Sequence, residues 1–108
     1  MRNVCLSVLA ASAVLLAGNV QASADLAKDS GCLNCHSVDT KLVGPSLKDI
    51  AAKYAGQDGA ADMLAGKIKN GSNGVWGAIP MPPNANVSDE NAKVLADFIL
   101  TLKISLVY

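Results

Sequence analysis

The sequence of 108 residues contains few aromatic side chains for its size. They make up 4% of the chain, whereas hydrophobic residues as a whole make up 51%. A domain of this length buries only about two-thirds of its unfolded surface, and large rings normally supply much of its core. The core therefore looks under-filled, and we expect a group other than protein to occupy part of it.

Charge of either sign is also not in excess. Nine Lys and Arg residues balance nine Asp and Glu residues, so the formal net charge is zero. Chains that bind nucleic acid or anionic membranes carry a marked positive surplus. We therefore expect neither nucleic acid nor an anionic membrane surface as a partner.

The N-terminus has the layout of a secretory signal peptide. Arg2 precedes an apolar run at 4–17, which is shorter than the roughly 17–25 residues of a membrane span. Small residues then offer cleavage after Ala22 or Ala24. The sequence predicts a cleaved signal peptide over 1–22, or 1–24, and one mature domain over 23–108. An uncleaved membrane anchor is the alternative.

Cleavage would also remove Cys5, which leaves the mature chain with Cys32 and Cys35. Export would place these two thiols in an oxidising compartment, the periplasm.

Hydrophobic spacing predicts an all-α domain with about four helices. No stretch alternates as a strand does, and the segment 71–87, rich in Pro, Gly and Asn, predicts a long irregular loop. Ser88 is a good N-cap for the last helix, with acidic residues in its first turn. The expected helices span 25–30, 46–54 and 60–69, followed by a last one whose apolar stripe is Leu95, Phe98, Ile99 and Leu102.

The chain has a single histidine, and it follows two cysteines in GCLNCHS, residues 31–37. C-x-x-C-H is the haem attachment pattern. Cys32 and Cys35 would form thioethers with the two vinyl groups of the porphyrin, and His36 would supply a nitrogen to the iron. A redox C-x-x-C normally follows a strand in a βαβ unit, which is missing here. A zinc site needs four ligands, and a second Cys/His pair is also missing.

A second iron ligand has to come from a residue other than histidine. Met81 lies between prolines in IPMPP, residues 79–83, where no helix or sheet requires a methionine. A stiff loop that aims one thioether at the iron explains this arrangement, and it also explains the long irregular loop. Met63 lies inside a predicted helix and is expected to fill space in the core or on the surface. A loop methionine that covers an apolar patch is the alternative for Met81.

Three blocks of sequence resemble the small bacterial class I c-type cytochromes, most closely the cytochrome c-551 type. These blocks are GCLNCHSVDTKLVGPSLKDIAAKYAG, KIKNGSNGVWGAIPMPPN and VSDENAKVLADFIL. The resemblance implies a class I cytochrome c fold, with about four helices around one covalently attached haem c. It implies that His36 and Met81 are the axial iron ligands.

The resemblance also assigns four further residues around the haem. The carbonyl of Pro45 is expected to accept a hydrogen bond from His36, and the side chain of Asn84 to bond near the methionine sulfur. Lys67 and Trp76 match residues that reach a haem propionate. The family often has arginine in place of Lys67, and a lysine cannot fork across two carboxylate oxygens as arginine does.

His/Met ligation closes both axial positions, so the chain is expected to be a one-electron carrier and not an enzyme. The resemblance implies a membrane cytochrome complex as donor, and a terminal reductase, oxidase or peroxidase as acceptor. Docking is expected to be brief, between monomeric partners, at the haem edge. The residues expected there are Leu33, Val43, Ile79, Pro82 and Pro83.

Three other functions stay open at this point. One is a haem protein that binds or transforms a small ligand at the iron. Another is a haem subunit docked permanently on a larger enzyme, for which the apolar tail 104–108 is the one indication. The third is an exported thiol–disulfide protein without haem, with a Cys32–Cys35 disulfide.

Overall fold

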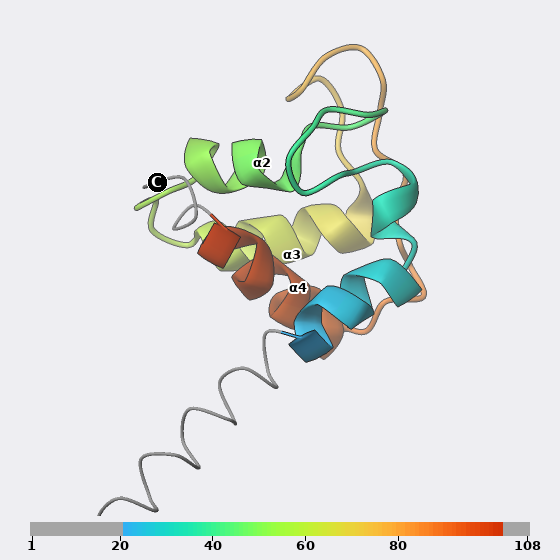
Figure 1. The fold of residues 1–108 in the computed structure, drawn as a ribbon, viewed down its shortest axis with the longest axis vertical. Coiled ribbons are helices and arrows are strands. Elements are labelled where there is room, and N and C mark those ends of the chain that lie inside the picture. Colours follow the sequence, from blue (N-terminus) through green and yellow to red (C-terminus); the bar gives the residue numbers. More distant parts are fainter. Residues whose placement is uncertain (1–20, 103–108) are drawn as a thin grey trace, which may run out of the picture.

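The computed structural model describes residues 21–102, which form a small helical domain (Figure 1). Residues 21–29 are helical, and a short 3₁₀ turn, η1, follows at Cys32–Asn34. Three further helices are α2 at Leu47–Lys53, α3 at Ala60–Asn70 and α4 at Asp89–Thr101. Within the described residues the one β pairing is an isolated bridge between Ser72 and Met81. The prediction of an all-α domain is confirmed.

Local sequence sets the ends of these helices. The Ser46 hydroxyl accepts from the backbone N–H of Asp49 at 3.0 Å, and that of Ser88 accepts from Asn91 at 3.0 Å. Both serines therefore satisfy an N–H that the first helical turn leaves without a partner. At the end of α3, the Gly71 N–H donates to the Lys67 carbonyl at 2.9 Å.

The predicted helix boundaries agree with the structure to within a few residues. The N-terminal helix already includes residues 21–24, and α3 extends one residue further than expected, to Asn70. Most of the predicted signal peptide, residues 1–20, lies outside the described residues, as does the tail 104–108. None of the helices within 21–102 is long and apolar enough to cross a membrane.

The core lies on both sides of α4. On one side, α4 packs against α2 and α3, with Leu47, Ile50 and Leu64 buried around Ala96 and Ile99. On the other side, Ala27 of the N-terminal helix meets Ile68 of α3 and Leu95 of α4. Phe98 and Leu102 of the predicted stripe are partly buried and pack against these clusters.

Two long loops complete the domain at the end remote from residues 54–59. One loop, 35–46, connects η1 to α2, and the other, 71–87, connects α3 to α4 (Figure 1). The second loop is irregular, as its composition predicts. Both loops lie beside α2 and α3, and the space that they enclose with these helices is where the functional side chains gather.

Two surface ion pairs join α3 to α4, Lys69 with Asp89 and Lys93 with Asp62. The hydrogen bond and the positive charge of Lys69 hold the pKa of the Asp89 carboxyl below its ordinary value of 3.8. Asp62 raises the pKa of the Lys93 ammonium in the same way. Both pairs are largely exposed, so each stabilises the fold only modestly.

We predict that the Lys69–Asp89 pair stabilises the domain above about pH 4 and not in strong acid. Because folding lowers the pKa of Asp89, its contribution is full above the unfolded pKa and is lost as pH falls through the folded pKa. In Lys69→Gln, the Asp89 pKa measured by NMR should rise to the ordinary value. Lys93→Gln is the matched control and should leave Asp89 unchanged; equal Asp89 pKa values in wild type and Lys69→Gln would refute the pairing.

Candidate functional site

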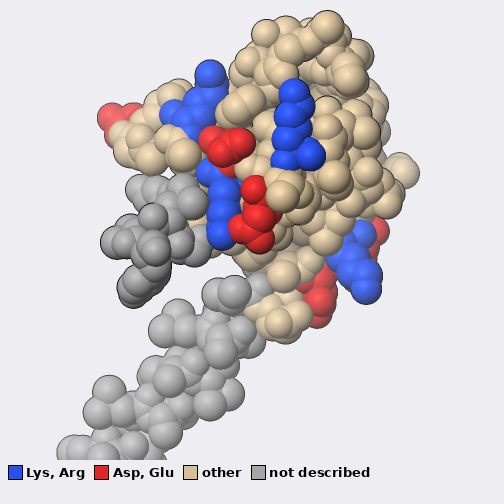
Figure 2. Space-filling model, turned by 45° about the horizontal axis from the view of Figure 1, so that its top comes forward, with Lys and Arg blue, Asp and Glu red and all other residues tan. Residues whose placement is uncertain are grey.

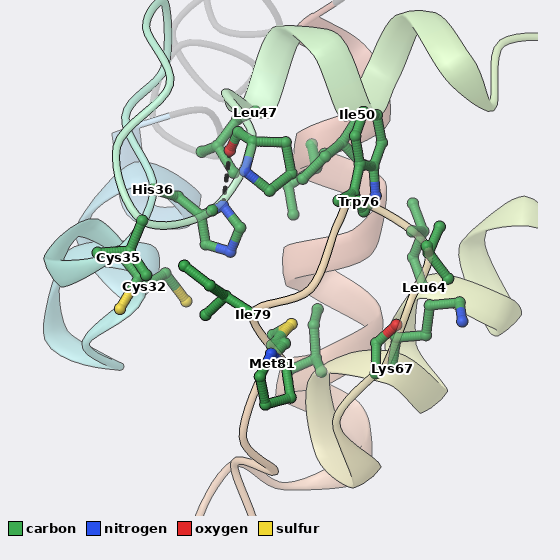
Figure 3. Close-up of a pocket in the computed structure, with 18 of the residues that line it drawn as sticks. Cys32, Cys35, His36, Leu47, Ile50, Leu64, Lys67, Trp76, Ile79 and Met81 are labelled. Atoms are coloured by element: carbon green, nitrogen blue, oxygen red, sulfur yellow. Dashed lines mark hydrogen bonds between the residues drawn. The ribbon is translucent and has the colours of Figure 1, made fainter.

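A large apolar cavity opens between α2, α3 and the two loops (Figure 3). The cavity and its open mouth together hold about 1010 Å³ of space that no protein atom occupies. The apolar content of the sequence thus surrounds a space that side chains do not fill. The lining is mostly aliphatic: Val43, Leu47, Ile50, Leu64, Ile68, Val75, Ile79 and Ile99.

Cys32, Cys35 and His36 lie at one end of this cavity (Figure 3). The η1 turn brings them together, because the N–H groups of Cys35 and His36 both donate to the Cys32 carbonyl, at 3.2 and 2.9 Å. Gly31 enters the turn at φ 83°, a left-handed conformation that glycine adopts without strain.

Cys32 and Cys35 form no disulfide in the structure, and the environment of Cys32 differs from that of the attacking cysteine in a redox C-x-x-C. Burial raises the pKa of the Cys32 thiol, and a backbone hydrogen bond offsets this only in part. Thiol–disulfide enzymes lower the pKa of their attacking cysteine instead, because the thiolate is the nucleophile. The environment of Cys32 therefore does not favour a thiol–disulfide function.

The imidazole of His36 is held by the backbone of the loop before α2. Its Nδ1 lies 2.7 Å from the carbonyl oxygen of Pro45. A carbonyl can only accept, so Nδ1 carries the proton, and in neutral imidazole this leaves the Nε2 lone pair free. Nε2 is therefore the nitrogen available to bind a metal ion from the cavity.

Gly44 allows this close packing. A Cβ at Gly44 would lie 2.6 Å from His36 Cε1 and 2.9 Å from Nδ1, distances that real Cβ atoms do not adopt. Gly44 was not singled out from the sequence, although a glycine directly before Pro45 was a usable sign of a close backbone approach.

Met81 lies across the cavity from His36 (Figure 3). Its backbone pairs with Ser72 in the isolated bridge, where Met81 N–H donates at 2.8 Å and Ser72 N–H donates back at 3.1 Å. Met63 lies elsewhere, partly buried against the core cluster of α2, α3 and α4. Of the two methionines in the described residues, only Met81 lines the cavity.

Lys67 and Trp76 lie at the end of the cavity opposite the two cysteines (Figure 3). Trp76 is 40% exposed, so it is not a core residue. The Lys53 ammonium lies 5.2 Å from the centre of the Trp76 ring, within the range of a cation–π contact. Lys53 was not singled out from the sequence, since a lone lysine in a helix gives no sign of a contact with a distant loop.

The Asn84 side chain is bonded to α3 and does not line the cavity. Its Nδ2 donates to the carbonyl oxygen of Ile68 at 3.0 Å, and its backbone N–H donates to the same oxygen at 3.0 Å. Asn84 thus caps the end of α3, beside a second, polar pocket. The resemblance predicts a bond from Asn84 near the methionine sulfur, which stays a prediction, and the structure shows this capping contact besides.

The five residues expected at the haem edge are all exposed. Val43, Ile79 and Pro82 also line the cavity, whereas Leu33 and Pro83 do not. Ile79 has the most open side chain of the large hydrophobics, at 67%. An apolar rim therefore adjoins the mouth of the cavity.

The residues that line the cavity fit a haem in donor chemistry. They offer two thiols at one end, an imidazole Nε2 and a thioether sulfur on facing sides, and a lysine and a tryptophan N–H at the other end. Sulfur and imidazole are ligands that haem iron accepts, and thiols are the groups that attach haem c.

Comparison with known proteins agrees with this geometry. The cytochrome c family model matches residues 20–103. Cytochrome c-552 of Nitrosomonas europaea is 67% identical over 103 residues, which covers 95% of this chain and all of that protein. Cytochrome c-551 of Pseudomonas aeruginosa is 54% identical over 99 residues, covering 91% of this chain and 94% of that protein.

Solved structures show the same likeness. The crystal structure of wild-type Nitrosomonas europaea cytochrome c552 has a TM-score of 0.73 at 72% identity, and the match covers 74% of this chain and 99% of that one. The class 1 cytochrome MtoD of Sideroxydans lithotrophicus ES-1 gives a TM-score of 0.64 at 31% identity, covering 77% of this chain and 95% of that one. The chain therefore belongs to the cytochrome c family: it carries covalently bound haem c and transfers electrons, and it is not an enzyme.

Proposed function

We propose that this cytochrome holds its haem through thioethers to Cys32 and Cys35, with His36 Nε2 and Met81 Sδ as the two axial ligands. One observation supports this assignment above all. The free nitrogen of His36 and the side chain of Met81 lie on facing sides of one apolar cavity, with both thiols at its end (Figure 3).

When bound, the haem supplies one-electron chemistry between ferric and ferrous iron. The residues around the haem set its reduction potential. A thioether ligand raises the reduction potential, and the aliphatic lining disfavours the extra positive charge of the oxidised state. The Pro45 carbonyl fixes the tautomer of His36 and increases its basicity as a ligand.

The opposite end of the cavity suits the haem propionates. Lys67 offers a positive charge there, and the Trp76 indole offers an N–H donor. Lys53 covers the Trp76 ring and adds a second positive charge nearby. Lys67, Lys53 and the Trp76 N–H would give the haem carboxylates positive charge and a hydrogen-bond donor nearby. The rim beside the thioether end would stay apolar.

Electron exchange takes place at the rim of Leu33, Val43, Ile79, Pro82 and Pro83. The loop 71–87 contains no charged residue, and Figure 2 shows a broad part of the surface without Lys, Arg, Asp or Glu. Electron-transfer partners use small interfaces, below about 1,200 Å² in total, that separate quickly. An apolar rim of this kind suits brief docking.

The proposed place of the protein in a reaction sequence follows from its carrier role. The N-terminal signal peptide, cleaved after Ala22 or Ala24, would deliver a monomer to the periplasm. There it would take electrons from a membrane cytochrome complex of a respiratory chain and pass them to a terminal reductase, oxidase or peroxidase.

The far-red absorption band of ferric haem with a methionine sulfur ligand tests the axial assignment. We expect the band in the wild-type protein, its loss in Met81→Ala, and a lower potential in that variant because the thioether is gone. Met63→Ala is the matched control and should keep the band. A wild-type protein with haem but without the band would indicate an open or differently ligated iron, and hence a ligand-binding haem protein.

Gly44→Ala tests the packing behind His36. The added Cβ has no room beside the imidazole, so we expect a loss of about 1–3 kcal/mol in the free energy of unfolding. Denaturant unfolding of the haem protein measures it. Gly66→Ala, inside α3 where a Cβ meets nothing within 4 Å, should instead stabilise the protein by about 0.5–1 kcal/mol. Equal stability of Gly44→Ala and wild type would refute the packing argument.

Ile79→Lys tests the docking rim. A charge at the centre of an apolar interface should slow electron self-exchange between two copies by about tenfold, an effect that buried interface residues commonly have. Val94→Lys changes an exposed apolar residue of α4 that does not line the cavity, and it should have little effect. Self-exchange rates from NMR line broadening measure both; an equal loss in the two variants would argue against the rim.

A further inference from the structure

The backbone on both sides of Met81 has few groups that can donate a hydrogen bond. Residues 80, 82 and 83 are prolines, which have no N–H. Met81 therefore carries the only backbone N–H between Ile79 and Asn84. The described part of the chain also gives no backbone–backbone hydrogen bond to residues 73–80.

The one available N–H of this stretch donates to Ser72, two residues beyond the end of α3 at Asn70. Met81 N–H donates to the Ser72 carbonyl at 2.8 Å, and the Met81 carbonyl accepts from Ser72 N–H at 3.1 Å. Both bonds use the backbone of Ser72 and not its hydroxyl. Met81, which carries the thioether, is therefore fixed through both its N–H and its carbonyl to Ser72, just beyond the end of α3.

Gly71 brings the two segments close enough for these bonds. It has φ 81° and ψ −178°, a conformation that side chains with a Cβ rarely adopt. A Cβ at this position would lie 2.6 Å from the Met81 carbonyl oxygen and 3.1 Å from the Pro83 nitrogen. Gly71 therefore serves two purposes: it ends α3, and it lets the methionine loop pass against the end of the helix.

A second anchor lies three residues beyond Met81. The Asn84 N–H and Nδ2 both donate to the Ile68 carbonyl, which belongs to the last turn of α3. Ile68 is itself buried between Ala27 and Leu95. The methionine loop is thus held at two points, by Ser72 just beyond α3 and by Ile68 within this core helix.

We infer that Gly71 and Ser72 are positioning residues for the axial methionine, and that their backbone contacts keep the Met81 sulfur against the iron. This inference rests on the proposed ligation by Met81 and extends it to two residues that are not iron ligands, Gly71 and the cavity residue Ser72. Loops held in one geometry lose less entropy when a ligand bond forms, so the clamp favours an intact iron–sulfur bond.

Imidazole binding to the ferric haem protein tests this inference. Imidazole can bind the iron only in those molecules in which the Met81 sulfur has dissociated from it. Gly71→Ala strains the loop at both the backbone and Met81, so the affinity for imidazole should rise roughly tenfold or more. The far-red band should also weaken. Gly66→Ala in the same helix is the matched control, and its affinity should stay within about twofold of wild type.

Two variants of Ser72 separate a backbone role from a side-chain role. Ser72→Ala keeps both bonds to Met81 and should bind imidazole like wild type. Ser72→Pro removes the N–H that donates to the Met81 carbonyl, and it should bind imidazole more tightly, as Gly71→Ala does. Ser72→Pro also decides the matter if Gly71→Ala yields no folded haem protein.

The outcomes distinguish this inference from the proposed ligation. A far-red band that survives Met81→Ala would overturn the ligation by Met81, and the clamp with it. If the band depends on Met81 but Gly71→Ala and Ser72→Pro bind imidazole with wild-type affinity, the ligation stands and the inference is wrong.

Discussion

The architecture depends on an apolar cavity that the side chains of the chain leave open. Aliphatic residues of α2, α3 and α4 face this space, yet few rings are present to fill it. The hydrophobic contribution of these residues is complete only when an apolar group covers them. Haem c supplies that surface, so in this family the cofactor is a part of the core as well as the redox centre.

Backbone groups, more than side chains, position the groups that face the cavity. The Pro45 carbonyl orients His36, the Ser72 backbone holds Met81, and the Cys32 carbonyl closes the turn around the two thiols. Such contacts need little from side chains except the absence of a Cβ, as at Gly44 and Gly71. Backbone positioning of this kind changes little when the charge of the site changes, because it involves no ionisable partner.

Much of the fold and the site could be predicted from the sequence because their signals are local. Ser46 and Ser88 precede apolar periodicity, and C-x-x-C-H is contiguous, so helix starts and the haem attachment motif are visible within a few residues. The contacts that escaped prediction join distant segments. Nothing in the neighbourhood of Gly71 shows that Met81 passes against it, and nothing near Lys53 indicates Trp76.

The asparagine at position 84 shows a further limit of reasoning from a motif. The family resemblance places its side chain near the methionine sulfur, and the structure adds a bond from Nδ2 to the Ile68 carbonyl that the motif does not indicate. An amide nitrogen has two protons, and sequence alone does not indicate which acceptors lie within reach. The capping contact forms because the loop 71–87 returns past the last turn of α3, where the Ile68 carbonyl has no partner within the helix. The path of that loop is not visible in the sequence around Asn84.

The three prolines around Met81 also affect how the molecule behaves in a crowded solution. An exposed, uncharged, apolar segment such as 78–83 would ordinarily be a hazard, because its free N–H groups can extend a β-ladder into a neighbouring chain. Within 80–83, three of those groups do not exist and the fourth, that of Met81, is already bonded to Ser72. The apolar segment around Met81 can therefore stay exposed, as the proposed docking rim requires, with little risk of aggregation through strand addition at 80–83.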